Sequence, residues 1–386
     1  MTGDLWSQIN QMLMKPLMKK ISLYIILLFY LSLSSSCAVQ DDKVLNIEML
    51  FKGDGYNVPF RASQIVTRSR YIALDDTVQI GAITDVRYSR DNYYVSERNR
   101  LCVFDSTGHY SFSIDACGRA ENEYISLDAF DVNHRNGEIS ILDLIGSRIL
   151  VFSGDGIFLR SFNLDTMIDL PRRICSLDDG HYIFYNPLRL ADLDSLRVGA
   201  WLVDSVGQFE KELFSPDEDY CYGGYVPYQR VFSRLGDGTI SLMGGEDHDY
   251  IYHITQGGEC SVAYKLRCDL TIPKEYLTKQ NLSKSERNDP NCYAKFAFFE
   301  TDSLVIVMAF NSQKTIWIYY DKRSGTEYIV DNNDDVVEEN GFSALCSNCA
   351  HDRLINVYYP GIDESIDAQL GVSSGSNPYL VISFMK

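Results

Sequence analysis

The stretch SPDEDYCYGGYVPY at residues 215–228 combines side chains in a way that is typical of a binding surface. It interleaves Tyr220, Tyr222, Tyr225 and Tyr228 with acidic residues and a Gly-Gly pair. A tyrosine ring offers a large apolar area with a polar tip, so it can stack on a sugar ring or anchor a partner protein. We therefore expect a ligand to contact Tyr220, Tyr222 and Tyr225. The alternative, in which two or three of these rings pack on the fold beneath them, stays open at this point.

A second charged segment, ACGRAENEY at residues 116–124, lies between two stretches with the composition of β-strands. We expect Glu123 and Tyr124 to hold a corner, with the carboxylate accepting backbone N–H groups and the ring packing beneath. Arg119 and Glu121 have no such role, so we expect them to face solvent. Together with Arg98, from the short ERNR stretch at 97–100, they are candidate ligand contacts.

Two familiar signatures, of zinc proteases and of nucleotide binding, do not occur in this sequence. It contains no His-Glu-x-x-His and no P-loop string. The acidic run at 331–335 begins like a calcium loop, but Val336 and Phe342 stand where the turn glycine and the bidentate glutamate belong. Cys346 and Cys349 form a lone C-x-x-C pair, whereas a zinc site needs four ligands. We expect these two cysteines to be packed thiols or a disulfide, and we predict no catalytic residue, metal ligand or cofactor.

The N-terminus has the organisation of an export signal. Met18 and two lysines precede a 13-residue apolar stretch at 21–33, followed by three serines and Cys37. A membrane-spanning helix needs about 20 residues, so we interpret residues 1–36 as a signal peptide whose true start is Met18. Small residues directly before a cysteine resemble a bacterial lipoprotein signal, in which Cys37 carries the lipid and residues 37–43 form a tether. A plain secretory signal is the alternative.

Composition limits the possible partners. The chain of 386 residues has 35 Lys+Arg against 53 Asp+Glu, a formal net charge of −18, and no basic run that could neutralise phosphates. We therefore expect no nucleic-acid partner. Such a protein repels acidic polymers at long range, which favours a neutral glycan or a protein with a basic patch as the ligand, with the arginines as a local exception.

The elements that must position these residues follow from an internal repeat. Five stretches place apolar or aromatic residues before a polar turn that ends in glycine: VFDSTG (103–108), VFSGDG (151–156), LVDSVG (202–207), YHITQGG (252–258) and YYDKRSG (319–325). Glycine supplies the positive φ that a tight reversal of two antiparallel strands requires. Each stretch therefore predicts the same hairpin in successive units.

Each unit can be completed to four short strands, as in ITDVRY, YYV, RLCVF and HYSFSI at residues 83–114. Four strands every 40 to 50 residues are typical of a propeller blade. We therefore predict an all-β, six-bladed β-propeller over residues 44–386, built from four-stranded antiparallel blades. The sixth blade lacks its outer strand, which we expect residues 44–75 to supply, closing the ring and protecting a sheet edge.

The mature chain resembles the bacterial six-bladed β-propeller lipoproteins, which are similar to NHL and TolB-like propellers. The resemblance is carried by YIAL (71–74), VFDSTG, CGRAENEY, DYIYHI (249–254) with IPKEY (272–276), and the terminal NPYLVISFMK. The family string Gly-x-Gly-Pro-Gly-Glu-Tyr is matched only at Gly118, Glu123 and Tyr124. The resemblance implies a Gram-negative cell-envelope protein, an outer membrane lipoprotein that faces the periplasm or the surface.

Two functions from different classes remain open. The first is a monomeric binding module that holds a glycan, a peptide or an envelope protein on the face with the longer loops. The second is an enzyme, because some related propellers are lyases or lactonases with a metal in the central channel. For such a metal the inner strands offer Asp85, Asp131 and Arg173, with His134 just beyond one of them. This is a thin ligand set, so we expect binding rather than catalysis.

Overall fold

The computed structural model describes most of the chain after residue 44, namely residues 45–49, 60–164, 170–187, 198–215, 231–244, 249–268, 276, 283–287, 289, 294–310, 315–331 and 348–386. The predicted signal peptide, Cys37 and its tether lie outside the described residues.

The first three blades of the propeller each consist of four consecutive antiparallel strands. They are β3 (Ile83–Ser89), β4 (Asn92–Glu97), β5 (Arg100–Asp105) and β6 (Tyr110–Ile114); β7 (Ala129–Val132), β8 (Ile139–Asp143), β9 (Arg148–Phe152) and β10 (Phe158–Asn163); and β11 (Arg173–Ser176), β12 (Tyr182–Asn186), β13 (Gly199–Val203) and β14 (Phe209–Phe214).

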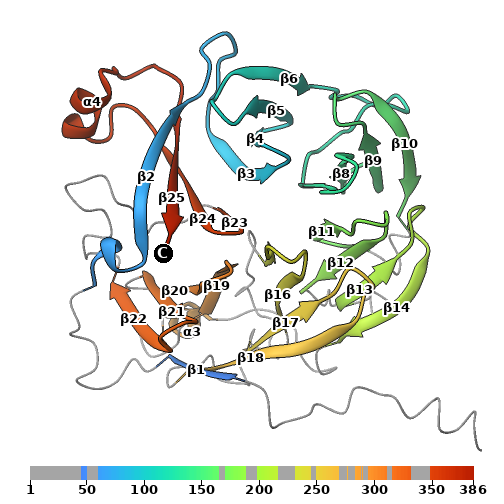
Figure 1. The fold of residues 1–386 in the computed structure, drawn as a ribbon. Helices are drawn as coiled ribbons and strands as arrows, with labels where there is room; N and C mark the ends of the chain where they lie inside the picture. The colour runs from blue at the N-terminus through green and yellow to red at the C-terminus, as the bar shows by residue number, and fades with distance from the viewer. Residues whose placement is uncertain are drawn as a thin grey trace, which may run out of the picture. The chain divides into compact units, whose positions relative to one another are not determined.

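Three further sheets complete the six-bladed ring, and Figure 1 shows the innermost strands of the sheets around the centre of the ring. Their strands are β15 (Phe232–Arg234), β16 (Ile240–Gly244), β17 (Tyr250–Ile254) and β18 (Cys260–Cys268); β19 (Ala294–Glu300), β20 (Leu304–Phe310), β21 (Thr315–Asp321) and β22 (Thr326–Asp331); and β23 (Asn348–Ala350), β24 (Arg353–Tyr358) and β25 (Tyr379–Met385). The predicted six-bladed all-β architecture is confirmed.

The first two strands of the chain join two different blades. β2 (Val66–Ala73) pairs antiparallel with β25, so it forms the outer strand of the sixth sheet. β1 (Leu45–Met49) instead pairs in parallel with β18 and adds a fifth strand to the fourth sheet. We expected the outer strand of the sixth blade to come from residues 44–75. The strand beside β25 is β2, from the second half of that range.

The five predicted hairpins all connect the third and fourth strands of their blades. Their terminal glycines all have positive φ, between 67° and 93°, at positions 108, 156, 207, 258 and 325. Gly108 also allows a close approach, since a Cβ there would lie 2.0 Å from the carbonyl oxygen of Ala73. The repeated glycine is thus a backbone requirement of the turn.

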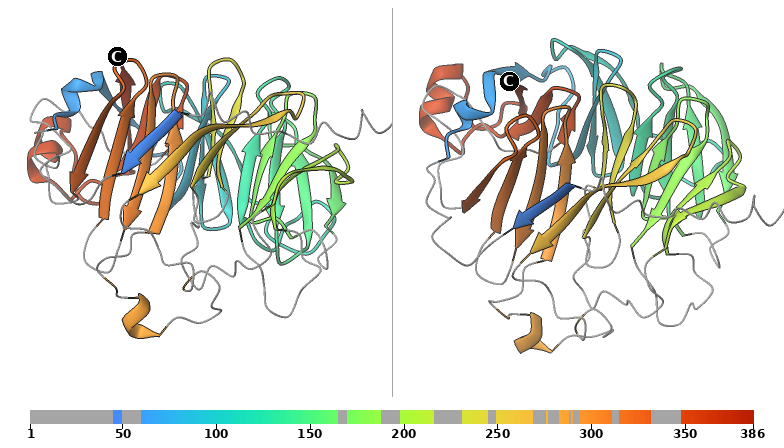
Figure 2. Two further views of the ribbon diagram at one scale, coloured as in Figure 1. Left: turned by 90° about the horizontal axis from the view of Figure 1, so that it is seen from below. Right: turned by 60° about the horizontal axis from the view of Figure 1, so that its bottom comes forward.

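The two faces of the ring differ. These hairpin turns and the first-to-second-strand turns lie on one face, which we call the tight-turn face. The opposite, loop-rich face carries the second-to-third-strand loops and the blade-to-blade connections (Figure 2). The short helices η3 (Ala62–Gln64), α3 (Lys284–Arg287) and α4 (Glu364–Leu370) lie in connections between strands. None of the helices in the described ranges is long and apolar enough to cross a membrane.

The core lies between neighbouring blades. Middle strands such as β8 and β13 are buried at every position, because each face of a sheet packs against another sheet. Between the first and second blades the apolar cluster includes Tyr94, Val103, Phe130 and Ile141. This packing fixes the inner strands, and so it positions the polar side chains that face the channel.

Candidate functional site

The centre of the channel is occupied by Arg87, which projects from β3. Its Nη1 lies 2.5 Å from Oδ1 of Asp131 on β7, and its Nε lies 3.4 Å from Oδ2 of Asp85. The other oxygen of Asp131 accepts hydrogen bonds from Ser176 on β11, at 2.6 Å from its backbone nitrogen and 2.7 Å from its Oγ. One arginine therefore connects the inner strands of the first two blades, and Asp131 extends the link to the third.

Both partners of the central ion pair stay charged at neutral pH. Burial by itself would raise the pKa of Asp131, but Arg87 and Arg234 outweigh that effect, so its pKa is lowered. Burial likewise disfavours the charged form of Arg87, yet Asp131 and Asp85 hold its pKa above the ordinary value. A buried pair of this kind is stable only when its hydrogen bonds are satisfied, as they are here.

On the loop-rich side of Arg87 the channel opens into a cavity of about 290 Å³, which we call the upper cavity. Three arginines and two aspartates contribute to its wall alongside smaller polar and apolar side chains. The full lining is Thr84, Asp85, Arg87, Ser96, Arg98, Leu127, Asp128, Ala129, Phe130 and Arg173. The cavity is thus close in size to small-molecule pockets and presents both donors and acceptors.

The exposed Arg98 reaches the upper cavity because its turn is held in place. Arg98 and Asn99 form the two-residue turn between β4 and β5, and Arg98 adopts φ of 50°, which is uncommon for a residue with a side chain. Arg100 pairs with Glu97 at 2.7 Å across the base of the turn. The Asn99 side chain bonds to the backbone of Ile125 and Leu127 at the start of the next blade, both at 3.4 Å. These contacts restrict where the Arg98 guanidinium can lie.

Arg173 contributes a second cation to the upper cavity from β11. Burial lowers its pKa, and the attraction of Asp85 only partly offsets this effect while Arg87 adds to it. Phe130, with Arg87 stacked over its ring at 5.3 Å, forms part of the apolar wall. Fixed charges beside an aromatic wall suit a ligand with several hydroxyl groups, because a hydroxyl both donates and accepts hydrogen bonds.

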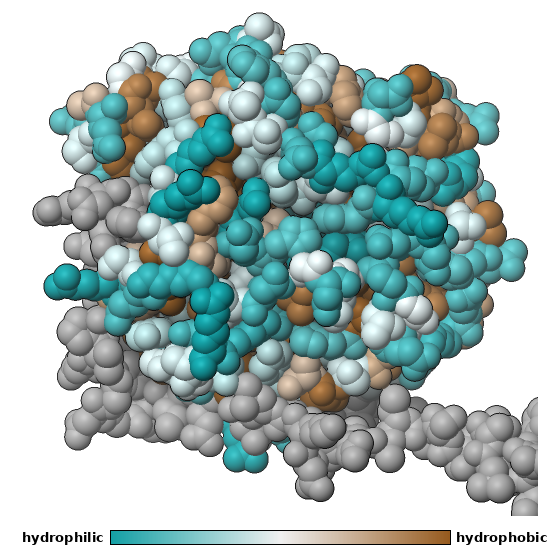
Figure 3. Space-filling model, in the orientation of Figure 1, coloured by the Kyte–Doolittle hydropathy of each residue, from teal (hydrophilic) through white to brown (hydrophobic). Residues whose placement is uncertain are grey.

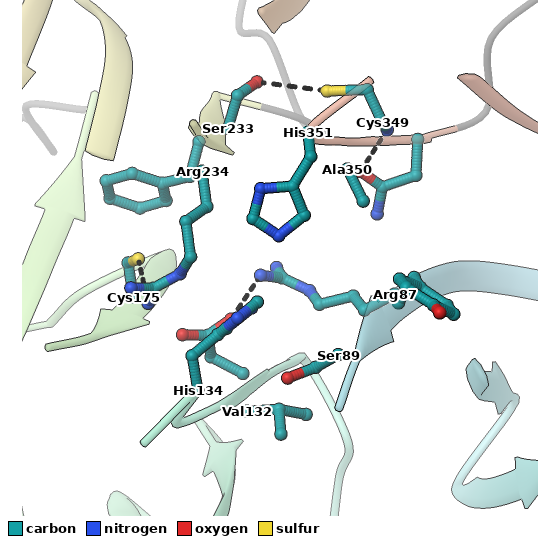
Figure 4. Close-up of a pocket in the computed structure, with 14 residues that line it drawn as sticks. Arg87, Ser89, Val132, His134, Cys175, Ser233, Arg234, Cys349, Ala350 and His351 are labelled. Carbon is teal, nitrogen blue, oxygen red and sulfur yellow. Dashed lines mark hydrogen bonds and ion pairs between the residues drawn. The ribbon is translucent and has the colours of Figure 1, made fainter. Parts of the chain in front are cut away.

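On the tight-turn side of Arg87 lies a second, smaller cavity of about 50 Å³, the lower cavity. Figure 4 shows Arg87 and the imidazoles of His134 and His351 directed toward a common space, with the Arg234 guanidinium at its edge beside Cys175. The two imidazole rings lie 5.9 Å apart in an edge-on arrangement. Arg87 therefore separates two cavities that open toward opposite faces of the ring.

The corner ACGRAENEY has the structural role that we predicted for Glu123 and Tyr124. The fully buried Tyr124 places its hydroxyl 2.5 Å from the carbonyl oxygen of Asn99 and 3.0 Å from that of Ile114. Glu123 accepts a hydrogen bond of 2.8 Å from the backbone of Ala120. A Cβ on residue 118 would lie 1.9 Å from the Glu123 carboxylate, which explains the glycine there.

The candidate ligand contacts from the sequence fall into three groups. Arg98 lines the upper cavity. Arg119 and Glu121 are exposed on the corner, as expected, but they are not among the residues lining either cavity. Tyr220, Tyr222 and Tyr225 lie outside the described residues. Their role in binding therefore stays a prediction.

The four residues suggested as a thin metal-ligand set do gather around the channel, but not around one point. The guanidinium of Arg87 stands between Asp85 and Asp131, so a cation of the protein already occupies the place between the carboxylates. His134 lines only the lower cavity and Arg173 only the upper one. Within the described part of the chain, no three His, Cys, Asp or Glu side chains are grouped so that they could hold a metal ion.

Sequence reasoning missed Arg87, Arg234, Ser89 and His351. Arg87 and Ser89 come from β3, Arg234 comes from β15 and His351 follows β23, so no local motif brings all four together. The available signal was a charged residue within a short inner strand, as with Arg87 and Asp131, 44 residues apart. Cys349 lies buried beside Ser233, with 3.6 Å between Sγ and Oγ. Cys346 lies outside the described residues, so the state of the pair stays a prediction.

A different cluster of charges lies between the fourth and fifth blades. Glu300, at the end of β19, is fully buried and accepts from Lys322 Nζ at 2.5 Å and from His253 Nε2 at 3.1 Å. Ser241 also donates to its carboxylate. Burial raises the pKa of Glu300, but His253 and Lys322 together lower it below the ordinary value. We call this group the Glu300 cluster.

Comparison with known proteins places the chain in a family. Residues 45–382 match the family model described as "Domain of unknown function (DUF4934)". Among solved structures, a "Putative exported protein" of Bacteroides fragilis is 17% identical with a TM-score of 0.66, covering 88% of this chain and 99% of that one. No curated protein matches the chain in sequence.

Two more distant structures were also found. A member of the DUF4221 family from Bacteroides vulgatus is 10% identical with a TM-score of 0.49, covering 83% of this chain and 97% of that one. A virginiamycin B lyase of Staphylococcus aureus, solved with quinupristin, is 11% identical with a TM-score of 0.39 and coverages of 78% and 80%. Likeness at such identities concerns the fold alone.

Proposed function

Since the chain belongs to the DUF4934 family, whose function the family description leaves open, we propose that it is an exported propeller that binds a ligand at the loop-rich mouth of its channel. The observation that carries this proposal is the upper cavity, with its polar wall of arginines and aspartates. A ring of rigid blades is a suitable scaffold for such a site, because its loops can vary while the inner strands stay fixed.

The chemistry of the wall favours a neutral, hydroxyl-rich ligand such as a glycan. The guanidinium groups of Arg98 and Arg173 donate hydrogen bonds, and the carboxylates of Asp85 and Asp128 accept them. The opposite charges also leave little net charge for selecting an ionic ligand. A cavity of about 290 Å³ has room for one sugar unit or one side chain of a partner, so the remainder of the ligand would lie on the surrounding face. A peptide or an envelope protein that inserts one polar group would use the same site.

The predicted tyrosines extend this site. Residues 215–228 follow β14 and precede β15, and connections of this kind belong to the loop-rich face. Tyr220, Tyr222 and Tyr225 would then stack on the part of the ligand outside the cavity, with Arg119 and Glu121 at the outer edge. Truncating a stacked tyrosine costs about 1 to 3 kcal/mol of binding free energy when it is a hot spot.

We also propose that the protein is anchored in the outer membrane through lipidated Cys37. The lipoprotein-like N-terminal sequence supports this proposal, as does the description of the B. fragilis structure as exported. In a Cys37→Ala variant the protein should move from the membrane fraction to the soluble one. If that variant stays with the membrane, lipid anchoring at Cys37 is wrong.

The binding proposal is tested with a glycan array and a pull-down from the native envelope. We expect Arg98→Ala and Arg173→Ala each to weaken binding by about tenfold or more, since a buried or charged hydrogen bond contributes 1.5 to 3 kcal/mol. Tyr222→Ala and Tyr225→Ala should weaken it as well. The matched control is Arg323→Ala, which removes an exposed arginine from a turn of the tight-turn face.

Binding that survives both Arg98→Ala and Arg173→Ala would place the ligand elsewhere. Circular dichroism melting curves distinguish this result from misfolding. Arg98 is exposed, so its loss should leave the melting temperature nearly unchanged. An array and a pull-down that both yield no ligand would contradict the proposed function as a whole.

A further inference from the structure

The lower cavity supports a separate inference, which does not rest on the proposed function. We propose that it binds a small oxyanion of the phosphate, sulfate or carboxylate type. The cavity lies on the tight-turn side of Arg87, away from the loop-rich face (Figure 4).

The first observation is an unpartnered hydroxyl. Ser89 is only 2% exposed, it lines the lower cavity, and its Oγ has no hydrogen-bond partner among the described residues. Figure 4 shows this oxygen pointing into the space near Arg87 and His134. A buried hydroxyl without a partner costs free energy, so its place in a polar cavity indicates that something else there accepts its hydrogen bond.

The second observation is the set of guanidinium donors around that hydroxyl. Arg87 and Arg234 both line the cavity. Arg87 pairs with Asp131 and Asp85. Arg234, with 12% of its side chain exposed, lies 3.6 Å from Asp178 and also donates to the backbone of Ser176. Asp131 is the one carboxylate among the described lining residues, and both of its oxygens are already engaged, by Arg87 and by Ser176. Its negative charge is therefore largely neutralised.

The two imidazoles add further donor capacity. His134 and His351 come from different blades and approach each other over the cavity, with 5.9 Å between ring centroids. Burial, together with the nearby Arg234, lowers the pKa of His134 to about 4, although Asp131 and Asp178 act in the opposite direction. The neutral imidazole still has one N–H that can donate to an oxyanion.

The size of the cavity fits one such ion. A buried water needs about 10 to 15 Å³ of accessible space, so about 50 Å³ accommodates roughly four waters or one small tetrahedral or planar oxyanion. Water alone could accept the Ser89 hydrogen bond. The paired arginines are the feature that favours an anion over water, because guanidinium groups match the geometry of carboxylate and phosphate oxygens.

The test uses the mature chain and three probes, namely inorganic phosphate, sulfate and acetate, with chloride as a control for ionic strength. Binding is measured by isothermal titration calorimetry, and the site is identified from the imidazole NMR signals of His134 and His351. We expect at least one oxyanion to bind and to shift both signals, while His109, exposed in a tight turn, should stay unchanged. The preferred probe then separates a carboxylate ligand from a phosphate or sulfate ligand.

Two variants make the assignment specific. Ser89→Ala should weaken binding by about tenfold, because a hydrogen bond to a charged group is lost. Arg234→Gln should weaken it more. Arg234 also bonds the backbone of Ser176, so that variant could fail to fold. Ser89→Ala, which removes no hydrogen bond within the described residues, then decides the question.

Three outcomes would overturn the proposal. These are no oxyanion binding above the chloride control, binding that Ser89→Ala leaves unchanged, and binding without any shift of the His134 and His351 signals. The first would mean that the cavity holds water only. Because Arg98 and Arg173 do not line the lower cavity, Arg173→Ala should weaken glycan binding by about tenfold or more while leaving oxyanion binding in place. A failure of one proposal is therefore distinguishable from a failure of the other.

Discussion

The Glu300 cluster and the lower cavity are two groups of buried charges in the same ring, yet they differ in how completely their polar atoms are paired. The carboxylate of Glu300 receives hydrogen bonds from Lys322, His253 and Ser241, and it is fully buried. In the lower cavity, Ser89 has no partner among the described residues and open space remains beside it.

The difference separates charges that hold blades together from charges that can hold a ligand. A fully paired cluster has nothing left to offer another molecule, and removing one member leaves a buried charge unpaired. A cluster with an unsatisfied donor and free space can bind another molecule. Removing that donor should change the stability of the protein only slightly. Burial of a charged residue alone therefore does not identify a binding site in a propeller.

The largest expected effect concerns the ring that both regions depend on. A chain that begins at residue 80 lacks β2, so β25 becomes an exposed sheet edge, and we expect aggregation and loss of a cooperative melting transition. Both charge clusters should then be lost together. A chain that begins at residue 60 is the matched control, because it lacks β1 but keeps β2. If the shorter chain melts as sharply as the mature one, β2 does not close the ring.

The next largest effect is expected in the Glu300 cluster, whose charges are fully paired. We expect Glu300→Ala to lower the free energy of unfolding by about 3 kcal/mol, because Lys322 and His253 lose their buried partner. The pKa of Glu300 lies below its ordinary value of 4.5, so this difference should be present above pH 4.5 and should shrink as the pH falls further. Chemical denaturation at several pH values measures it. Oxyanion binding should stay within about twofold, and a large loss of binding would contradict the separation of the two regions.

A smaller effect tests the lower cavity through its histidine. The pKa of His134 falls from 6.5 to about 4 on folding, so between these values the unfolded chain binds more protons than the folded one. Stability should therefore decrease as the pH is lowered from 6.5 to 4, by on the order of 2 kcal/mol. A His134→Gln variant cannot titrate and should lose this part of the pH dependence. If the stability of the wild type and of the His134→Gln variant depended on pH in the same way, His134 would not be held neutral in the folded protein.

The smallest effect is the most specific one. Ser89→Ala removes a hydroxyl with no partner among the described residues, so in oxyanion-free buffer the free energy of unfolding should change by less than about 0.5 kcal/mol. The added stability that phosphate gives the wild type should be much reduced in this variant. A loss of 2 kcal/mol without any anion would mean that Ser89 makes a structural contact.

Much of the fold could be predicted from the sequence, because the turn glycines repeat in it. Gly108, Gly156 and their three counterparts adopt positive φ at the same hairpin of five blades, so their spacing indicates the blade length. The Tyr124 corner was equally readable from its local string. The pairing of residues 45–49 could not be predicted. They pair in parallel with β18, more than 200 residues away, and such pairing leaves no local signature in the sequence.

The site was only partly predictable for the same physical reason. Arg98 could be found because it lies in a short charged turn. Asp85, Asp131, Arg173 and His134 were recognised as channel residues, but their chemistry depends on Arg87, which reaches Asp131 across 44 residues of sequence. Whether a buried charge is paired depends on contacts between blades, and these contacts are not encoded in any one segment.

The central claim is that the protein binds its ligand at the upper cavity on the loop-rich face. Hydrogen–deuterium exchange tests this claim most directly, with the ligand that the array or the pull-down identifies. We predict that the bound ligand slows exchange in residues 84–87, 96–99 and 127–130, which line or border the cavity. Exchange in the turns at 105–109, 153–157 and 204–208 of the opposite face should stay unchanged. Protection confined to those turns, with none around the cavity, would contradict the account.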